Sequence, residues 1–355
     1  MGDSKAKAQR RSEFPPLPEP LPIEAVDNHT HLESVIGFRG SALPAADAPD
    51  PQNDGAARGN IAETFRAAEA QLRLAKKAGI NAIVQVGCEI PSERWTDQFL
   101  KHLESGSVVS RQPGGLPQPT DSADDGEAAD VVGAIAIHPN EAVRHAGVYE
   151  VAKDGLEPED RPHHQIPLAD AIAEIAELAK NNKRIRAIGE TGMDLFRAGP
   201  KGAEVQRQAF RDHIAIAKEL DLALQIHDRE AHAQVIEVLK KDGAPAKTVF
   251  HCFSGDGEMA KICAENGWYM SFAGPVTYKA NDGLRAALKI APRRLILAET
   301  DAPYLTPHPY RGQPNAPYAV NYTIRAMAEY RGVTLEAMCQ TIAQNSAKVY
   351  GPWDS

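Results

Sequence analysis

Histidine and carboxylate residues stand at the ends of apolar runs along most of the 355-residue chain. The first run ends in the segment Asp27–His31, whose sequence is DNHTH. Later runs end at or beside four further residues of these types: Glu190, His227, His251 and Asp301. Because alternate side chains of a strand share a face, we expect His29 and His31 to point the same way. Imidazoles and carboxylates are ligands that borderline divalent metals prefer, so the pattern indicates a metal site with hydrolytic chemistry.

These histidines and carboxylates recur along the chain because the apolar runs that they end alternate with helical patterns. We predict eight strands: Ile23–His31, Ala82–Gly87, Val131–His138, Ile185–Glu190, Ala223–His227, Thr248–Phe253, Trp268–Phe272 and Arg294–Glu299. We predict helices between and after them: Ala62–Ala78, Glu93–Leu103, Leu168–Lys180, Ala203–Leu220, Glu230–Lys240, Asp256–Asn266, Asn281–Lys289, Pro317–Tyr330 and Thr334–Val349. Eight strand–helix units most economically close into a (β/α)8 TIM-like barrel of the metal-dependent hydrolase type, with a doubly wound open sheet as the alternative.

In such a barrel the C-terminal ends of all strands meet at one face, where active sites form. A lone histidine at a strand end is usually structural, but six polar residues at matching strand ends favour a metal centre. The predicted metal ligands are His29, His31, Glu190, His227, His251 and Asp301. This set exceeds the three protein ligands of one catalytic zinc ion and points to two divalent ions bridged by Glu190.

Two such ions would lower the pKa of a bound water to near neutrality and so supply hydroxide at pH 7. Asp301 is predicted to be catalytic as the general base that accepts the water proton, and Glu190 as the bridge between the ions. The ligand types leave the metal open among Mg²⁺, Mn²⁺ and Zn²⁺. Imidazoles favour zinc or manganese, whereas phosphoryl chemistry commonly uses magnesium.

Composition limits the classes of function. The formal net charge of −9 argues against a protein that grips nucleic acid by bulk positive charge. It does not exclude a nuclease, because bound metal ions bring their own charge to the site. The longest apolar runs are too short to span a bilayer. The four cysteines form no CxxC pair, so we expect neither structural zinc nor a disulfide framework, and we expect a cytoplasmic location.

The domain organisation follows from where the strand–helix rhythm starts and where it breaks. Residues 1–21 carry basic residues and then a Pro-rich stretch with no apolar segment behind the charges. We therefore predict a disordered leader rather than a signal peptide. Residues 22–355 are predicted to form a single barrel domain. Three segments break the rhythm and are predicted to be inserted loops: those near 36–59, 105–130 and 147–167.

Short motifs surround the predicted ligands in a definite order. They are DNHTHL (27–32), AIHP (136–139), GETGMD (189–194), QIHDR (225–229), HCFSG (251–255), ETDAPYL (299–305) and RG (311–312) followed by Asn315 and Pro317. With these motifs, the chain resembles the TatD family of metal-dependent deoxyribonucleases, a branch of the amidohydrolase superfamily. The resemblance extends from Asp27 to Tyr350.

The resemblance implies a TIM-like barrel that hydrolyses phosphodiester bonds with divalent cations. By position it assigns the metal roles to the same six residues and makes His138 a substrate contact. The expected activity is that of a deoxyribonuclease, a 3′–5′ exonuclease on single-stranded or frayed DNA ends. Ala134–Ala136 replaces the usual glycine before His138, and Asn140 stands where a second histidine is common. These departures concern substrate preference, because none removes a ligand.

Several further residues have two interpretations. Arg229 and Arg311 follow motif residues, so each either binds a substrate phosphate or braces a loop. Tyr304 either stacks on a base or packs its loop, and we favour packing. Asp27 either orients an imidazole or is an ordinary polar strand residue. Cys252 follows His251 in a predicted strand and is therefore expected to point into the helix layer.

Two other functions remain open from the sequence. The first is a hydrolase of C–N, ester or lactone bonds on the same barrel, because a fold does not determine function. Many such enzymes bridge their metals with a modified lysine at the fourth strand, whereas Glu190 occupies that place here. The second is a non-catalytic nucleic-acid-binding protein, which the net charge of −9 disfavours. The oligomeric state stays undetermined.

Overall fold

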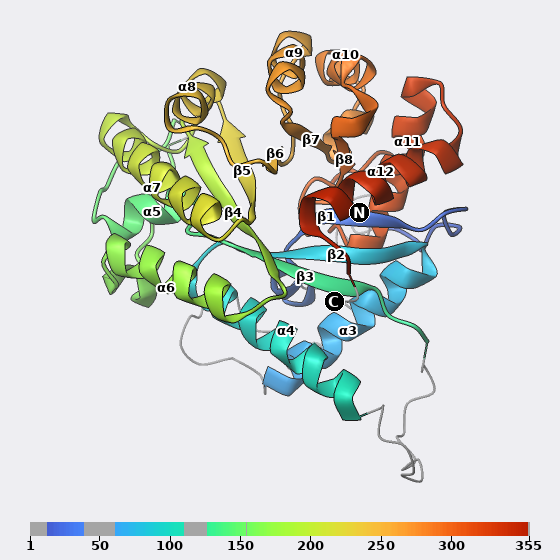
Figure 1. The fold of residues 1–355 in the computed structure, drawn as a ribbon, viewed down its shortest axis with the longest axis horizontal. Helices are drawn as coiled ribbons and strands as arrows, with labels where there is room; N and C mark the ends of the chain where they lie inside the picture. Colours follow the sequence, from blue (N-terminus) through green and yellow to red (C-terminus); the bar gives the residue numbers. More distant parts are fainter. Residues whose placement is uncertain (1–12, 39–60, 110–125, 154, 354–355) are drawn as a thin grey trace, which may run out of the picture.

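Eight parallel strands in chain order, β1 to β8, form one sheet that curves into a barrel (Figure 1). The computed structural model describes residues 13–38, 61–109, 126–153 and 155–353. The strands are β1 (Ala25–Thr30), β2 (Ile80–Gly87), β3 (Asp130–Ile135), β4 (Ile185–Asp194), β5 (Ala223–Arg229), β6 (Thr248–Phe250), β7 (Tyr269–Phe272) and β8 (Ile296–Ala298). The prediction of a (β/α)8 barrel is confirmed, and the strand order contains no reversal of the kind that a doubly wound sheet requires.

The barrel closes where β1 meets the end of β8. Thr30 and Ala302 form an isolated parallel bridge, and the His31 amide donates to the Ala302 carbonyl at 2.9 Å. The Asn28 side-chain amide donates to the Ala298 carbonyl at 2.8 Å. These bonds place the loop after β8 directly beside the end of β1.

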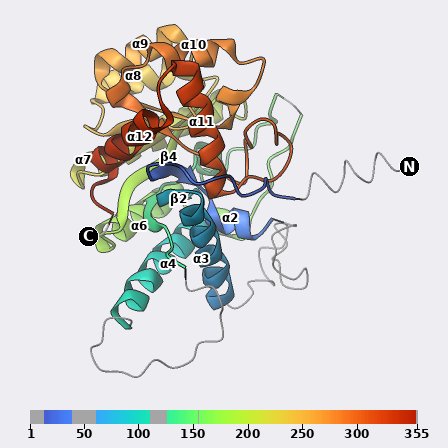
Figure 2. The ribbon, with the colours of Figure 1, turned by 90° about the vertical axis from the view of Figure 1, so that its right-hand side faces the viewer.

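Helices surround the strands (Figure 1). They are α2 (Leu32–Ile36), α3 (Ile61–Lys77), α4 (Ile90–Val109), α5 (Pro139–His145), α6 (Leu168–Asn181), α7 (Pro200–Glu219), α8 (His232–Asp242), α9 (Gly257–Asn266), α10 (Asp282–Ile290), α11 (Val320–Arg331) and α12 (Leu335–Tyr350). All nine predicted helices are present, with shifted ends. The short helices α2 and α5 were not predicted, because five to seven residues are too few to show helical periodicity. Figure 2 shows α3 and α4 side by side, where Phe65 packs on Phe99.

Alternation along the strands builds two apolar layers. On β2, Val84 and Val86 point into the barrel, whereas Ile83 packs outward in the layer between strands and helices. Tyr350 at the end of α12 joins the inner layer, and its hydroxyl accepts a hydrogen bond from the Gln225 amide at 2.7 Å. The barrel is thus a filled core, and its functional site lies at the C-terminal ends of the strands.

The segments that break the strand–helix rhythm are described in part. Residues 39–60 and 110–125 lie outside the described residues, and so do residues 1–12 of the predicted leader. Helix α4 continues to Val109, so the segment predicted as a loop near 105–130 begins as a helix. The segment near 147–167 contains the 3-10 helix Pro162–Gln165.

The prediction of a disordered leader is wrong for residues 13–21, which contact the rest of the protein. Tyr318 donates its hydroxyl to the Pro15 carbonyl at 2.6 Å, and the Asn321 amide donates to the Glu19 carbonyl at 3.0 Å. Leu21 is buried in the core between strands and helices. The Pro-rich composition suggested disorder, but its carbonyls and apolar side chains find partners on α11 and the turn before it. Among the described residues, no helix combines the length and apolar character needed to cross a membrane.

Candidate metal centre

The six residues predicted as metal ligands lie together at the C-terminal face of the barrel. His29 lies on β1, Glu190 on β4 and His227 on β5. His31 and His251 directly follow β1 and β6, and Asp301 lies in the loop after β8. Four of the six are buried, and His227 and Asp301 are half-buried. The convergence that the barrel prediction required is therefore present in the structure.

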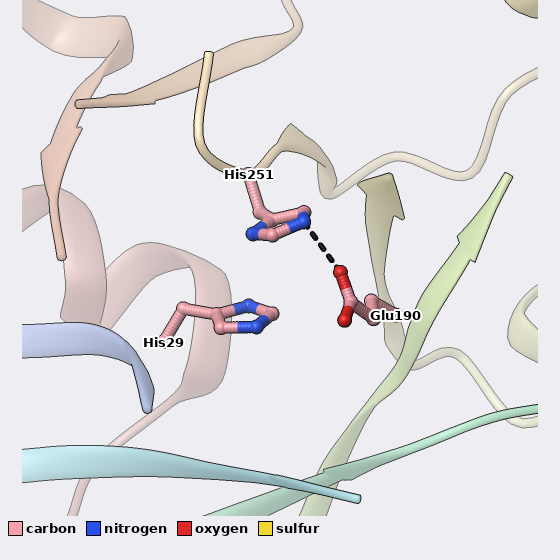
Figure 3. Close-up of side chains that lie close together, drawn as sticks. All are labelled: His29, Glu190 and His251. Atoms are coloured by element: carbon pink, nitrogen blue, oxygen red, sulfur yellow. Dashed lines mark ion pairs between the residues drawn. The ribbon is translucent and has the colours of Figure 1, made fainter. Parts of the chain in front are cut away.

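Glu190 occupies the middle of this group. Its Oε2 lies 2.5 Å from His251 Nε2 and 3.3 Å from His227 Nδ1. Its Oε1 lies 3.9 Å from His31 Nε2 and 3.9 Å from His138 Nε2. Figure 3 shows the His251 ring directed at this carboxylate. The two oxygens of Glu190 thus face different imidazoles, which is the arrangement that a bridging carboxylate needs.

A second carboxylate serves the histidines of β1. Asp301 Oδ1 lies 3.4 Å from His31 Nε2 and 3.8 Å from His29 Nε2. The His29 and His251 rings stack with centroids 4.0 Å apart (Figure 3). Asp301 has a φ of +57°, a left-handed conformation that is uncommon for residues other than glycine and is concentrated at functional sites.

The Nδ1 atoms of His29 and His31 are hydrogen-bonded to the protein, and that of His251 faces a carboxylate, so each ring presents Nε2 to the centre. His29 Nδ1 lies 2.9 Å from Gln225 Oε1, and it is the donor because the Gln225 amide nitrogen already donates to Asn28 and Tyr350. His31 Nδ1 donates to the Val86 carbonyl at 2.9 Å. His251 Nδ1 lies 3.3 Å from Glu299 Oε1. Such anchoring of the remote nitrogen is typical of metal-ligating histidines.

Charge is unevenly distributed among the imidazoles. Burial and the nearby His251 hold the pKa of His29 well below its usual value, so this ring is neutral at pH 7. Burial also opposes charge on His31, but its hydrogen bond to Asp301 and the charge of Glu190 raise its pKa to about 9. Burial would raise the pKa of Glu190, but the positive charge on His251 outweighs it and holds this pKa well below the usual range. The carboxylates therefore attract cations, whether protons or metal ions.

The donor set fits divalent metal ions. His29 Nε2 is buried, and it has no hydrogen-bond partner in the described structure. Four triads of this centre have ligand atoms within 4.8 Å of one another: His29–His31–Asp301, His29–Glu190–His251, His31–Cys88–Glu190 and His138–Glu190–His227. A neutral, unpartnered imidazole nitrogen beside carboxylate oxygens is the donor chemistry that zinc or manganese prefers.

Cys88 is a further residue at this centre, and the sequence reasoning missed it. Its Sγ lies 3.2 Å from Glu190 Oε1 and 3.8 Å from His31 Nδ1. Burial, followed by the charge of Glu190, raises the pKa of this thiol well above its usual value. A usable signal was present, because Cys88 directly follows the apolar run of β2, as the predicted ligands follow theirs.

Asp194 and Asp27 hold the ligands in place. Asp194 Oδ1 accepts hydrogen bonds from the backbone amides of Phe196 and Arg197 and so braces the loop after β4. The other oxygen of the same carboxylate, Oδ2, lies 3.3 Å from His227 Nε2. The interpretation of Asp27 as a partner of an imidazole is wrong. Its carboxylate accepts the Thr300 amide at 2.8 Å and the Thr300 hydroxyl at 2.6 Å, so it positions the residue before Asp301.

Two glycines of the GETGMD motif are needed because a side chain at either position would collide with β5. A Cβ at Gly189 would collide with the side chain of Gln225, and a Cβ at Gly192 would collide with the His227 carbonyl. Gly192 also has a φ of +140°, which disfavours residues with a side chain. The glycines therefore let β4 approach β5 closely enough to bring Glu190 and His227 together.

The predicted substrate contacts lie at or after the C-terminal ends of β3, β5 and β8. His138 caps α5, where its Nδ1 accepts the Asn140 amide at 3.1 Å. Burial, followed by His227, lowers the pKa of His138 to about 4, so the neutral ring carries its proton on Nε2. Arg229 and Arg311 are exposed, and their guanidinium carbons lie 4.0 Å and 4.5 Å from the ring centroids of aromatic neighbours: Phe196 and Tyr278.

Two interpretations of residues near the rim change with the structure. Tyr304 is 57% exposed with its ring centroid 6.3 Å from that of His31, so the favoured packing role does not hold. Cys252 does not continue a strand, because β6 ends at Phe250 and Cys252 has a φ of +41°. Instead of pointing into the helix layer, Cys252 lines a cavity of about 280 Å³ together with Phe253, Ser254, Ala273, Pro275, Ala280, Asn281, Gly283 and Leu284.

His213 on α7 braces the strand ends that carry His138 and Glu190. Its Nε2 accepts the Ile137 amide at 3.2 Å and its Nδ1 donates to the Ala209 carbonyl at 2.7 Å. Burial lowers the pKa of His213 from 6.5 to about 4. Between pH 6.5 and 4, His213 therefore binds a proton in the unfolded chain but not in the folded chain. As the pH falls through this range, His213 progressively lowers the free energy of unfolding.

Replacement His213→Gln should remove this part of the acid sensitivity. Between pH 6.5 and 4 the wild type should lose about 3 kcal/mol more unfolding free energy than the variant. Urea unfolding at several pH values measures the difference. Parallel pH profiles for the two proteins would contradict the buried, neutral state of His213.

Comparisons with known proteins agree with this geometry. The chain matches the family model described as "TatD related DNase" over residues 26–351. The "Uncharacterized metal-dependent hydrolase TatD" of Mycobacterium tuberculosis is 33% identical over 281 residues, which cover 78% of this chain and 88% of the relative. YJJV, a TatD homologue from Escherichia coli, superposes with a TM-score of 0.63 at 20% identity, covering 92% of this chain and 98% of that chain. A variant of a PTE-like lactonase from Deinococcus radiodurans reaches 0.54 at 14% identity, covering 93% and 97%.

The two solved structures share too little sequence to show more than a common barrel fold. The family model covers nearly the whole described barrel, and the mycobacterial relative is matched over most of its length. Together with the converging histidines and carboxylates, these matches assign the chain. It belongs to the TatD family and is a metal-dependent hydrolase.

Proposed function

We propose that this hydrolase cleaves phosphodiester bonds of DNA, as a 3′–5′ exonuclease on single-stranded or frayed ends. The observation that carries the proposal is Glu190, whose two carboxylate oxygens face separate imidazoles. A carboxylate so placed suits two divalent ions, with Mg²⁺, Mn²⁺ and Zn²⁺ as candidates. The description of the matched family, "TatD related DNase", supports DNA as substrate. All four cysteines are free thiols, which supports the cytoplasm as the location.

The proposal divides the ligands between two sites. His29, His31 and Asp301 would hold one ion, His227 and His251 the other, and Glu190 both. When bound, the ions supply Lewis acidity at the phosphate and lower the pKa of a water molecule. In the proposed reaction a water molecule would attack phosphorus and give its proton to the Asp301 carboxylate. The bond from phosphorus to the 3′ oxygen would break, and the 3′ oxygen would leave as a hydroxyl after it takes a proton from solvent.

The residues around the ligands would hold the substrate. The neutral His138 ring, with its proton on Nε2, would donate to a phosphate oxygen. Arg229 and Arg311 rest on aromatic rings, and no salt bridge to either occurs within the described residues, so both guanidinium groups can bind phosphate. The exposed ring of Tyr304 offers a surface on which an unpaired base stacks. Since stacking needs an accessible base face, single strands suit this site.

A second candidate function is hydrolysis of a lactone, ester or C–N bond in a small molecule. The cavity of about 280 Å³ lined by Cys252 favours it, because this volume is close to the lower range of small-molecule pockets, although none of the six predicted ligands lines it. The likeness to a lactonase concerns the barrel alone. The arginines discriminate between the candidates, since a neutral lactone has no phosphate for them to bind.

Arginine removal should therefore impair cleavage of DNA alone. We expect Arg229→Ala and Arg311→Ala each to lower kcat/KM on a single-stranded oligonucleotide about tenfold, as one charge-assisted hydrogen bond is lost. Rates on an uncharged lactone should not change. Steady-state kinetics on both substrates, with 3′-labelled and 5′-labelled DNA to show the direction, measure the effects.

The exposed Arg66 on α3 provides the matched control. Arg66→Ala removes one positive charge without touching the rim and should leave both rates unchanged. Turnover of the lactone but not of DNA by the wild type would replace the first candidate with the second. Equal losses in the Arg66 and Arg311 variants would attribute the effect to net charge.

A further inference from the structure

A second histidine–carboxylate cluster lies outside the centre described above, along α5 and the 3-10 helix that contacts it. Glu141 and His145 belong to α5, while His163 and His164 belong to the 3-10 helix Pro162–Gln165. We propose that Glu141, His145 and His163 form a structural site for a divalent ion of the zinc class. Their ligand atoms lie within 4.8 Å of one another. The sequence had indicated no structural zinc because its cysteines are not paired, but this site uses none.

His145 is the residue that points to an ion. It is 6% exposed, and its Nδ1 donates to the Ile166 carbonyl at 2.7 Å. The neutral ring therefore has its lone pair on Nε2. That atom is buried, and no described residue offers it a hydrogen bond. A buried acceptor without a partner is costly, and a metal ion on Nε2 would satisfy it while the bond to Ile166 orients the ring.

The other two ligands already face each other. Glu141 Oε2 lies 3.0 Å from His163 Nε2, and both side chains are mostly buried. A further carboxylate oxygen, Glu89 Oε2, lies 3.7 Å from His163 Nε2, but it is paired with the Arg161 guanidinium. Two imidazoles and one carboxylate, completed by water, make the four-coordinate set of a zinc ion. The negative charge of Glu141 favours a cation at this position.

His164 is not a ligand, although it is adjacent. Its Nδ1 accepts the Arg161 backbone amide at 2.9 Å, so the neutral ring carries its proton on Nε2. This proton is donated to Glu141 Oε2 at 2.8 Å. His164 therefore positions the Glu141 carboxylate and has no lone pair to offer an ion.

The place of the site in the fold suggests its role. It joins α5, which begins next to His138, to the chain that leads from the 147–167 segment into α6. An ion here would fasten that segment to the helix and so help hold His138 beside Glu190. Its contribution is to the structure, because none of its ligands contacts the catalytic carboxylates among the described pairs.

Metal content tests the proposal directly. The full chain is loaded with Zn²⁺, dialysed and measured by mass spectrometry of the metal. We expect His145→Ala and Glu141→Gln each to bind one zinc equivalent fewer than the wild type. His164→Ala should keep the wild-type count, and so should His102→Ala, which removes an imidazole that pairs with Glu69 on another face. Loading with Co²⁺ should show tetrahedral visible absorption that disappears in the first two variants only.

Two results would overturn the proposal. One is a wild-type zinc count in Glu141→Gln, whose side chain keeps its shape and can still accept hydrogen bonds from His163 and His164. This variant decides the question even if His145→Ala does not fold. The other is an equal loss of zinc in His164→Ala and His145→Ala, which would contradict the assignment of ligands by ring proton.

Discussion

Glu190→Gln is expected to lower kcat on single-stranded DNA by about 10³-fold while the protein stays folded. Glu190 places one oxygen 2.5 Å from His251 and the other 3.9 Å from His31, so the amide would remove the negative charge shared by both halves of the centre. Loss of several kcal/mol of charge stabilisation corresponds to this factor in rate. The change is nearly isosteric, and the barrel core does not depend on it.

Three measurements on the variant separate chemistry from folding. Steady-state kinetics report kcat, circular dichroism reports the helices, and elemental analysis reports bound metal, which should decrease. The control is Glu174→Gln, which removes a partly exposed ion pair with Arg94 on the helices and should leave kcat unchanged, because such pairs contribute at most about 1 kcal/mol to stability. A Glu190→Gln enzyme that retains a tenth of the wild-type rate would disprove the bridging role.

Removal of divalent ions is expected to reduce turnover to the background rate and to leave the barrel folded. The proposed reaction needs an acidified water, and no imidazole or carboxylate of the centre supplies comparable acidity at pH 7. The fold persists because its two apolar layers do not include the six ligands. Dialysis against a chelator, followed by kinetics and circular dichroism, measures both effects.

Restoration of single metals then identifies the cofactor. Because four imidazoles face the centre, Zn²⁺ or Mn²⁺ should restore turnover at lower concentration than Mg²⁺. Add-back to Glu190→Gln serves as the control and should restore little. Full cleavage in excess chelator would overturn the metal-dependent mechanism proposed for this chain.

The sequence was sufficient to predict the barrel and the residues at its mouth. Strands such as Ala223–His227 and helices such as Leu168–Lys180 are visible because burial imposes a local period on the residues. Once eight such units alternate, parallel strands must present their C-terminal ends on one face. His29, Glu190 and Asp301 could therefore be placed together without any knowledge of a contact.

Other features could not be predicted, because they depend on which atoms meet. Gln225 anchors His29 from a strand nearly two hundred residues away, and Asp27 binds Thr300 rather than an imidazole. Cys88, which follows β2, reaches Glu190 on β4, although β3 lies between these two strands. Each of these contacts follows from strand register and side-chain rotamer, neither of which leaves a periodic trace in the sequence.

The sequence by itself determined the strand order, the face of the barrel that carries chemistry and the six residues that converge there. Tertiary structure alone decided how those residues are oriented, and it alone brought His145 on α5 to His163 beyond the next loop. The physical reason is one of range. Periodic burial produces a local pattern in the sequence, whereas the partner of a polar atom depends on packing between segments that are distant in the sequence.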